Sequence, residues 1–396
     1  MDQDPGSEAI GLKRVEATLP ADWYHDPVQH ERELQAIWYR AWLYVCRSAE
    51  IGPGQYRTHN LGTQTVLLVR DVDGTLRAFH NTCRHRGAEL CPAGAGPLKS
   101  RAIVCRYHQW TYGLDGALAR TPHGTTAPDF DPSAYGLHKV GVREWRGFVY
   151  VKIEGDGMDF DAALDPSPAW LANWPLERLV VGHAMVRELA CNWKVFWENY
   201  NECLHCPSVH PSLCDLVPIY GRAIMRPDDP AVGTDPASDD PRHRGGLRRG
   251  AETWSMNGLA AKPGFDTLTP QERAKGYRFL TIVPSGYVVA HPDYVRVVSM
   301  RPLSPERTEL RAEWLFLPET LADPGFDLAN VVDFATTVME EDAEVCEINQ
   351  RGLRARAYRE GVLMPQEYEL KAFHDWVRAR LRNSKNNDGE GREGSS

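Results

Sequence analysis

Short apolar runs separated by turn-forming pairs dominate the chain from about residue 42 to 155. In TVLLVRDVDGTLRAFHN, the Asp73-Gly74 pair predicts a hairpin turn between two strands, and GFVYVKIEG predicts a further strand. A second pair of this kind, Asp115-Gly116, lies further along the same region. The pattern predicts a small antiparallel β domain over residues 42–155.

The remaining segments alternate between helical and strand-like periodicity. Residues 1–41 end in a helical pattern, HERELQAIWYRAW, and are expected to pack on the second domain. That domain, residues 156–382, is expected to begin with a helix at residues 186–205, followed by long loops at 222–266. Several antiparallel strands are expected at 277–317 and a long amphipathic helix at about 327–356. The tail, residues 383–396, is too polar to bury a core and is predicted to be disordered.

Composition narrows the functional classes. The chain has 396 residues, 42% hydrophobic and 25% charged, and a formal charge of −9, which is ordinary for a two-domain globular protein and argues against nucleic-acid binding. No apolar run is long enough for a membrane helix, and the first residues lack the pattern of a secretory signal. Nine scattered cysteines fit a reducing compartment, so we expect a cytoplasmic protein.

Two mixed pairs of cysteine and histidine lie in the β region, as Cys-Arg-His at 83–85 and Cys-Arg-Tyr-His at 105–108. A Rieske-type [2Fe–2S] cluster needs two thiolates on one iron and two imidazoles on the other. Zinc sites with the same residue types usually arrange them as Cys–Cys and His–His pairs, so the mixed pairs favour the cluster. The predicted cluster ligands are Cys83, His85, Cys105 and His108.

A second constellation lies in NYNECLHCPSVHPSL, residues 199–213. On a helix, Glu202 and His205 would share one face, and Pro207 would end the helix so that His210 could turn back toward the same centre. Two imidazoles and one carboxylate form the facial triad of non-haem iron(II) oxygenases. Cys203 and Cys206 have no second cysteine pair to complete a zinc site, so we expect free thiols there.

The carboxylate of the triad is expected from the long helix at 327–356. Asp342 falls within an apolar stripe at helical spacing, formed by Phe334, Val338, Val345 and Ile348. An unpaired carboxylate is costly to bury, so Asp342 requires a cation. The sequence therefore predicts His205, His210 and Asp342 as iron ligands, with Glu341 as the alternative to Asp342.

Together these motifs resemble the oxygenase (α) component of Rieske non-haem iron oxygenases, over nearly the whole chain from LPADWYHDPVQHERELQAIWYRAW onward. Cys-Arg-His-Arg-Gly and Cys-x-Tyr-His-x-Trp-x-Tyr are similar to the Rieske domains of that family, although Gln109 stands where the family usually has glycine. NWKVFWENYNECLHCPSVHPSL is similar to the branch comprising glycine betaine, choline, carnitine and stachydrine monooxygenases. In that branch a glutamate, here Glu202, precedes the first iron histidine by three residues.

The resemblance implies an α+β protein whose catalytic domain is a helix-grip fold, an antiparallel sheet wrapped round a long helix. It also implies a homotrimer in which Glu202 bridges His205 and a cluster histidine of a neighbouring subunit. Dioxygen would be the co-substrate. Electrons would come from NADH or NADPH through a separate reductase, since this chain has no flavin or nicotinamide fingerprint.

The implied reaction is hydroxylation or N-demethylation of a quaternary ammonium or N-methylated compound. The alternative is hydroxylation or dihydroxylation of an aromatic or alicyclic carboxylate. Aromatic side chains that could surround a cation are Tyr220, Trp254, Tyr287 and Tyr294, although each taken singly is typical of a core residue. Two other functional classes are possible. A pure electron carrier would lack the second iron, and a metal-stabilised binding protein would lack oxygenase activity.

Overall fold

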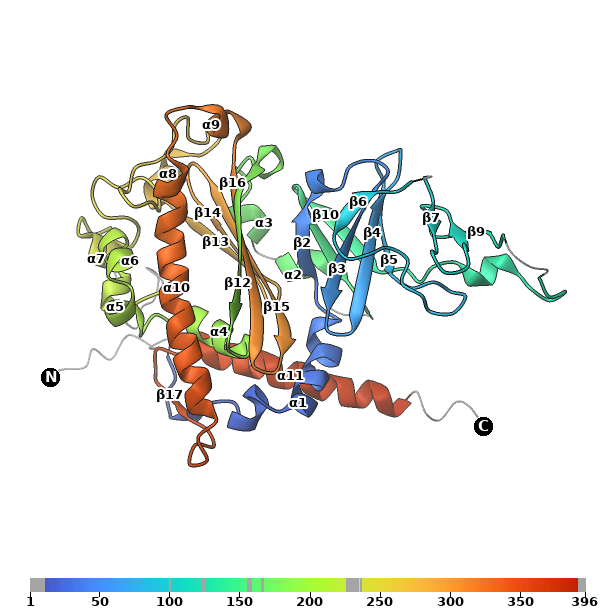
Figure 1. The fold of residues 1–396 in the computed structure, drawn as a ribbon. Coiled ribbons are helices and arrows are strands. Elements are labelled where there is room, and N and C mark those ends of the chain that lie inside the picture. Colours follow the sequence, from blue (N-terminus) through green and yellow to red (C-terminus); the bar gives the residue numbers. More distant parts are fainter. Residues whose placement is uncertain are drawn as a thin grey trace. The chain divides into compact units, whose positions relative to one another are not determined.

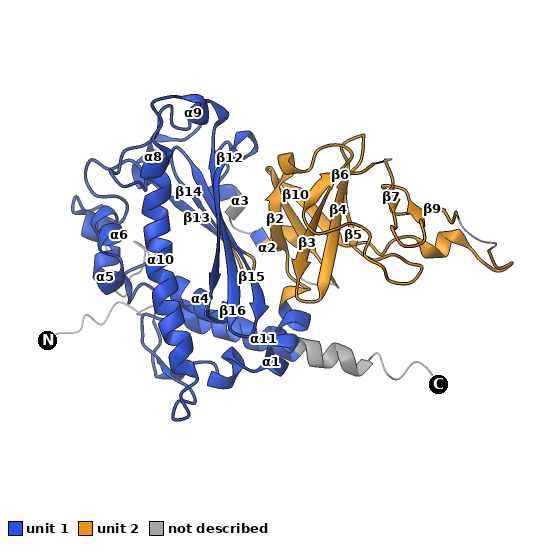
Figure 2. Cartoon of the chain, viewed as in Figure 1, with its two compact units in different colours: residues 1–37, 164–281, 286–396 blue, residues 38–163, 282–285 orange. Residues whose placement is uncertain are grey.

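A computed structural model describes residues 11–99, 101–122, 126–154, 159–164, 167–225, 235 and 237–390. The chain forms two compact units (Figure 2): unit 1 comprises Met1–Ile37, Leu164–Thr281 and Gly286–Ser396, and unit 2 comprises Trp38–Ala163 and Ile282–Ser285. The predicted domain limits at residues 41, 155 and 382 stay predictions. Of the tail predicted to be disordered, residues 391–396 lie outside the described residues, and the backbone of 383–390 belongs to helix α11 (Tyr368–Glu390).

Unit 2 consists of small antiparallel sheets. One has the order β5-β4-β3-β6, with β3 at Gln55–Leu61, β4 at Gln64–Arg70, β5 at Leu76–His80 and β6 at Ala95–Pro97. The others are β10-β11-β2 (Gly141–Trp145, Phe148–Lys152, Leu43–Arg47) and β7-β8-β9 (Ile103–Val104, Thr111–Tyr112, Leu118–Arg120). Both predicted turns join paired strands, and Gly74 and Gly116 have φ of +91° and +88°, which glycine adopts without steric cost.

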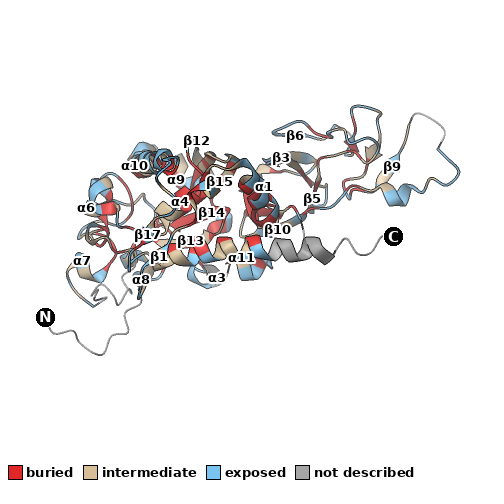
Figure 3. Cartoon of the chain, turned by 90° about the horizontal axis from the view of Figure 1, so that it is seen from below, coloured by how far each residue is buried: buried red, intermediate tan, exposed pale blue. Residues whose placement is uncertain are grey.

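Unit 1 is built on a five-stranded antiparallel sheet of order β12-β16-β15-β14-β13. The strands are β12 (Val180–Leu189), β13 (Arg278–Ile282), β14 (Gly286–Ala290), β15 (Val295–Ser304) and β16 (Arg307–Phe316). Along β16, Thr308, Leu310 and Ala312 are buried while the residues between them are not, so the sequence alternates as a one-faced strand should. The predicted strand region 277–317 is confirmed, and the buried residues of β14 are marked in Figure 3.

The long helix α10 (Leu328–Leu353) lies alongside this sheet (Figure 1), and its apolar positions are buried at helical spacing. Phe334 and Val338 face the core as predicted, but Ile348 is 51% exposed. Ile348 is ten residues after Val338, which is about 2.8 helical turns and not a whole number of turns. Its side chain therefore points away from the face that carries Val338. An antiparallel sheet with a long helix against it matches the expected catalytic fold.

The N-terminal segment of unit 1 is tied to helix α4 (Trp193–Tyr200) by a buried ion pair. The Lys194 Nζ lies 2.8 Å from both carboxylate oxygens of Glu33, and the Trp193 Nε1 donates to Glu33 Oε2 at 2.8 Å. Glu33 belongs to α1 (Pro27–Glu33), and strand β1 (Glu16–Ala17) pairs with β17 (Val362–Leu363). The early residues therefore support the helix that precedes the candidate iron site.

The predicted helix over 186–205 is wrong at both ends. Residues 180–189 form strand β12, the Asn192 side chain caps α4 by accepting from Lys194 N, and α4 ends at Tyr200. Pro207 lies in the first turn of a new helix, α5 (Cys206–Val209), instead of ending an old one. Glu202 and His205 therefore sit in the turn between two helices.

Among the described residues, no helix combines the length and the apolar character that a membrane crossing requires.

Candidate functional site

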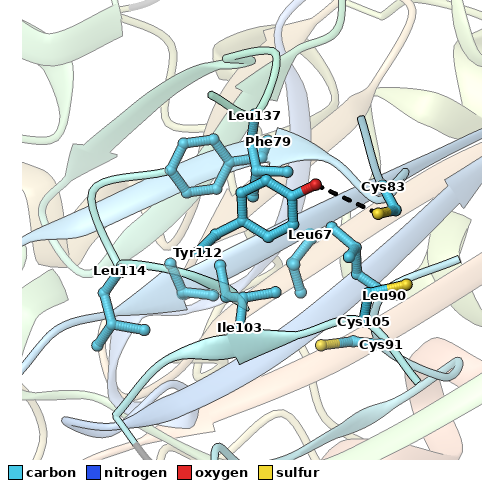
Figure 4. Packing of buried hydrophobic residues seen from close by; sticks show 11 residues of the cluster. Leu67, Phe79, Cys83, Leu90, Cys91, Ile103, Cys105, Tyr112, Leu114 and Leu137 are labelled. Atoms are coloured by element: carbon cyan, nitrogen blue, oxygen red, sulfur yellow. Dashed lines mark hydrogen bonds between the residues drawn. The ribbon is translucent and has the colours of Figure 1, made fainter. Parts of the chain in front are cut away.

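The two predicted cluster cysteines lie in the core of unit 2. Cys83 follows β5 and Cys105 follows β7, and their exposed fractions are 3% and 1%. Both pack among apolar side chains with Tyr112, whose hydroxyl lies 3.2 Å from the Cys83 Sγ (Figure 4). Burial raises the pKa of the Cys83 thiol, against the opposing hydrogen bond from Tyr112. Thiolates in this position need a bound cation, which suits an iron–sulfur cluster.

The two predicted cluster histidines lie on the outer side of the same loops. His85 is exposed and His108 half-buried, and their ring centroids are 4.7 Å apart. The Trp110 ring stacks on His85 at 4.8 Å and 7°. The structure thus brings the four residues together with the thiols inward and the imidazoles at the surface.

Gln109 adopts a left-handed backbone conformation between the second ligand pair and Trp110. Its φ is +59°, and its N–H donates to the Cys105 carbonyl at 2.9 Å. Glycine adopts this region freely, whereas an L side chain is strained there by about 1–2 kcal/mol. The position at which this chain departs from the family pattern is therefore one where the loop geometry favours glycine.

Replacing Gln109 with glycine should raise the free energy of unfolding of the metal-loaded protein by about 1 kcal/mol, because the strain of the left-handed conformation is removed. Urea denaturation, followed by the cluster's visible absorption, measures this. Thr111→Gly in strand β8 is the matched control and should lower the free energy of unfolding. Destabilisation by Gln109→Gly would contradict the expectation.

The three predicted iron ligands converge in unit 1. The Nε2 atoms of His205 and His210 lie 3.4 Å and 3.0 Å from the Oδ1 of Asp342. His210 is buried at the junction of α5 and α6 (Pro211–Leu216), and Asp342 comes from the middle of α10. Two imidazole nitrogens and one carboxylate oxygen facing one point form the donor set of a facial triad.

A second carboxylate supports each imidazole from behind. The Nδ1 of His205 lies 2.6 Å from Glu202 Oε1, and the Nδ1 of His210 lies 2.8 Å from Glu341 Oε2. Such outer carboxylates fix the tautomer that presents Nε2 to a metal. Glu341, the alternative to Asp342 in the sequence prediction, lies on the far side of His210 from the point of convergence.

The electrostatics of the site also suit a cation. Burial by itself would lower the pKa of His205, but hydrogen bonds to Asp342 and Glu202 outweigh it and raise this pKa to about 9. Burial by itself would raise the pKa of Asp342, but its hydrogen bonds to the two imidazoles lower it below the usual value. The carboxylate of Asp342 therefore favours positive charge at this point, which a metal ion bound to the two imidazoles would supply.

Two features of this region were not anticipated from the sequence. The Asn199 Nδ2 lies 3.3 Å from the His205 Nε2, so a neutral amide borders the same point of convergence. Asn199 and His205 also line a cavity of about 260 Å³, together with Glu198, Glu202 and Glu367. Glu198 is held there by the Tyr24 hydroxyl, whose oxygen is 2.5 Å from Glu198 Oε1. The sequence offered only one indication that Asn199 belongs to the site, namely that it is six residues before His205.

Cys203 and Cys206 form a disulfide, so the expectation of free thiols was wrong there. Their Cα atoms are 5.0 Å apart, within the range that a disulfide spans. Cys203 lies in the turn that carries Glu202 and His205, and Cys206 is the first residue of α5. The bond closes the loop between the two residues.

The predicted aromatic residues separate into two groups. Trp254 lies 6.3 Å from Tyr220 between ring centroids, and its carbonyl accepts from the Tyr294 hydroxyl at 2.7 Å. Tyr287 instead stacks at 4.5 Å on Tyr200, the last residue of α4. Tyr220 and Tyr294 therefore lie around Trp254, and Tyr287 lies beside the helix that leads to the iron site.

Comparison with protein families settles the class. Residues 41–131 match the Rieske [2Fe–2S] domain, and residues 176–383, more than half of the chain, match the catalytic domain of the ring-hydroxylating alpha subunit. The chain belongs to the ring-hydroxylating alpha subunits. As a Rieske non-haem iron oxygenase it is an oxidoreductase with a [2Fe–2S] cluster and a non-haem iron.

Individual relatives of this Rieske oxygenase are similar along most of their length. The glycine betaine monooxygenase oxygenase subunit of Chromohalobacter salexigens is 30% identical, over 94% of this chain and 88% of the relative. The chloroplastic choline monooxygenase of Beta vulgaris is 30% identical, over 92% of this chain and 77% of the relative. A quaternary ammonium Rieske monooxygenase solved with γ-butyrobetaine has the same fold, with a TM-score of 0.70, 24% identity and coverage of 93% and 96%.

Proposed function

We propose that Cys83, His85, Cys105 and His108 hold the [2Fe–2S] cluster and that His205, His210 and Asp342 hold the catalytic iron. The observation that carries this proposal is the iron site. Two imidazole Nε2 atoms face one oxygen of Asp342 while carboxylates hold both Nδ1 atoms. Few arrangements other than a metal site require this pattern of four carboxylate–imidazole contacts.

The two metal groups supply one-electron transfer and dioxygen activation when they are bound. The residues of this chain orient them and connect them. Glu202 binds the His205 Nδ1 through Oε1 and accepts the Leu204 N–H through Oε2, which fixes both oxygens of its carboxylate. It also lines a small surface pocket next to Tyr368 and Glu369. A partly accessible carboxylate on the iron ligand His205 suits the role of an electron-transfer bridge.

We propose further that the protein is a homotrimer in which Glu202 of one subunit receives a cluster histidine of the next. The outward position of His85 and His108 supports this, because these rings are available to a neighbouring surface. A separate NADH- or NADPH-dependent reductase is the proposed electron source, and the cytoplasm the proposed location. The reductase would approach the exposed imidazole side of unit 2.

The proposed substrate is a small quaternary ammonium or N-methylated compound. Relatives named for glycine betaine and for choline support the class, as does the fold shared with a quaternary ammonium monooxygenase. One oxygen atom of dioxygen enters an N-methyl C–H bond, and the other leaves as water after two electrons and two protons are added. The resulting hemiaminal releases formaldehyde and the demethylated amine.

Analysis of the purified protein should give about three irons and two acid-labile sulfides per chain, because a two-iron cluster and one mononuclear iron are both present. Cys105→Ser should reduce this to about one iron and no sulfide. Colorimetric iron and sulfide assays on the same sample measure both. Two irons and two sulfides in the wild-type protein would refute the mononuclear site.

The substrate class is tested with a surrogate reductase and a set of N-methylated compounds. Formaldehyde release that is stoichiometric with NADH consumption is the expected result for a quaternary ammonium substrate. Oxidation of benzoate-type acids without formaldehyde release would instead favour the aromatic carboxylate alternative.

A further inference from the structure

Arg296, on strand β15, is a buried cation for which the described part of the chain supplies no counter-charge. Its side chain is 4% exposed, and neither Nε nor Nη1 has a hydrogen-bond partner. No ion pair of Arg296 occurs among the residues that the structure describes. Removing a partner from a buried charge typically destabilises a protein by several kcal/mol, so a guanidinium in this state is expected to receive an anion.

The strand register places Arg296 in the interior of the catalytic unit. It is paired with Val289 on β14 and with Trp314 on β16, both completely buried. Residues paired across an antiparallel sheet share one face, and so do residues two apart on a strand. Tyr287 therefore lies on the face of Arg296, and its ring stacks on Tyr200 of α4.

The acidic residues around Arg296 are already engaged or face away. Glu313 is paired with Val297, the next residue along β15, and so belongs to the opposite face, where it binds Arg311 at 2.7 Å. The Asp293 carboxylate accepts from the Thr253 hydroxyl at 2.6 Å and from the Ala261 N–H at 2.7 Å. Among the described residues, no carboxylate therefore pairs with Arg296.

Tyr287 connects Arg296 with the iron site. Burial raises the pKa of Tyr287 to about 12, the charge of Arg296 opposes this shift, and the charge of Asp342 adds to it. Geometry gives the same connection: Tyr287 shares the sheet face of Arg296, and its ring stacks at 4.5 Å on Tyr200, two residues before Glu202 in the chain. A small molecule beside Tyr287 could present one end to each of them.

We propose that Arg296 binds the carboxylate of the substrate, so that this oxygenase acts on N-methylated carboxylates of the betaine type in preference to amino alcohols such as choline. The inference rests on the proposed function, which leaves open whether the far end of the substrate is an acid or an alcohol. A guanidinium binds a carboxylate through two parallel hydrogen bonds, and the N-methyl end then lies toward His205, His210 and Asp342. An alcohol would leave the buried charge unpaired.

Four ligands that differ at only two positions test this. Glycine betaine and choline carry the trimethylammonium group with a carboxylate and an alcohol respectively. In 3,3-dimethylbutyrate and 3,3-dimethylbutanol an uncharged tert-butyl group replaces the trimethylammonium group. Binding is measured by calorimetry on the metal-loaded protein without dioxygen. Wild type should prefer the acid in each pair. Arg296→Gln should weaken glycine betaine binding by about 100-fold and change choline binding by less than about threefold.

Two further variants serve as controls. Arg296→Lys keeps the charge and should retain a preference for acids, with binding about 10-fold weaker than wild type because the bidentate geometry is lost. Arg301→Gln, on the same strand but paired with Glu309 at 2.6 Å, should leave the preference for acids intact. The thermal unfolding of each variant, followed by circular dichroism, confirms that the catalytic unit has folded.

The two proposals fail in different ways. Equal binding of glycine betaine and choline by wild type, or equal weakening of both in Arg296→Gln, would overturn the role of Arg296. If 3,3-dimethylbutyrate binds as tightly as glycine betaine and Arg296→Gln weakens both, the role of Arg296 stands and the quaternary ammonium proposal fails.

Discussion

Replacing Asp342 with asparagine should lower the iron content from about three to about two atoms per chain, with the sulfide content unchanged. Asp342 Oδ1 is the only carboxylate oxygen that faces the Nε2 atoms of both His205 and His210 in the described part of the chain, and an amide is a much weaker iron ligand. Activity should fall below about 1% of wild type, since loss of outer partners alone costs 10- to 100-fold. Iron and sulfide assays, with formaldehyde release, measure the effect.

Two variants on the same helix delimit this result. Asp333→Asn changes an exposed aspartate of α10 and should leave iron and activity intact. Glu341→Gln removes the carboxylate behind His210 and should weaken iron binding by about 10- to 100-fold without abolishing it. If Glu341→Gln lost the iron completely and Asp342→Asn kept it, the two assignments would have to be exchanged.

The Asp342 variant also tests the trimer. Asp342→Asn keeps the cluster and Cys105→Ser keeps the iron, so neither is active as a pure protein. When they are assembled together at random, about a quarter of the positions should pair an intact cluster with an intact iron in the adjacent subunit, which restores about a quarter of wild-type activity. Electron transfer within single chains would restore none. Co-purification through two different affinity tags, one on each variant, confirms that mixed trimers have formed.

The second large effect is expected from Glu202→Gln. The amide oxygen can still accept from the Nδ1 of His205, so both metal centres should remain bound. The loss of the negative charge on the bridge should slow product formation by about 10- to 100-fold. The measurement is a single turnover that starts from the reduced cluster with dioxygen and substrate, in which cluster oxidation and product are followed separately. Product formed per cluster oxidised should fall.

Glu344→Gln, an exposed glutamate on α10, is the matched control and should behave like wild type. Normal turnover in Glu202→Gln would remove Glu202 from the electron path. Loss of iron in this variant would show instead that Glu202 acts mainly by holding His205.

The sequence by itself determined the cluster motif, the strand-rich first domain and the long helix. Each of these depends on residues close together in the chain: two ligand pairs with internal spacings of two and three residues, Asp-Gly turns, and apolar residues at a regular period. Local patterns of this kind are visible without a fold. The same holds for the spacing of Glu202, His205 and His210, which indicated a metal site before any geometry was known.

Tertiary structure decided what depends on distant parts of the chain. Asp342 and Glu341 are adjacent in sequence, and Asp342 is 132 residues beyond His210. Only the packing of α10 shows that Asp342 faces the Nε2 of His210 while Glu341 binds its Nδ1. The start of α4 at Trp193 is set by the Asn192 cap and by the pairing of residues 180–189 as a strand, so helical periodicity placed it too early. Arg296 is one arginine among many in the sequence. The register of β15 places its side chain on an interior face, and only the folded chain shows that it is buried with no ion pair among the described residues. A side chain's face and partners are fixed by strands that are distant in the sequence.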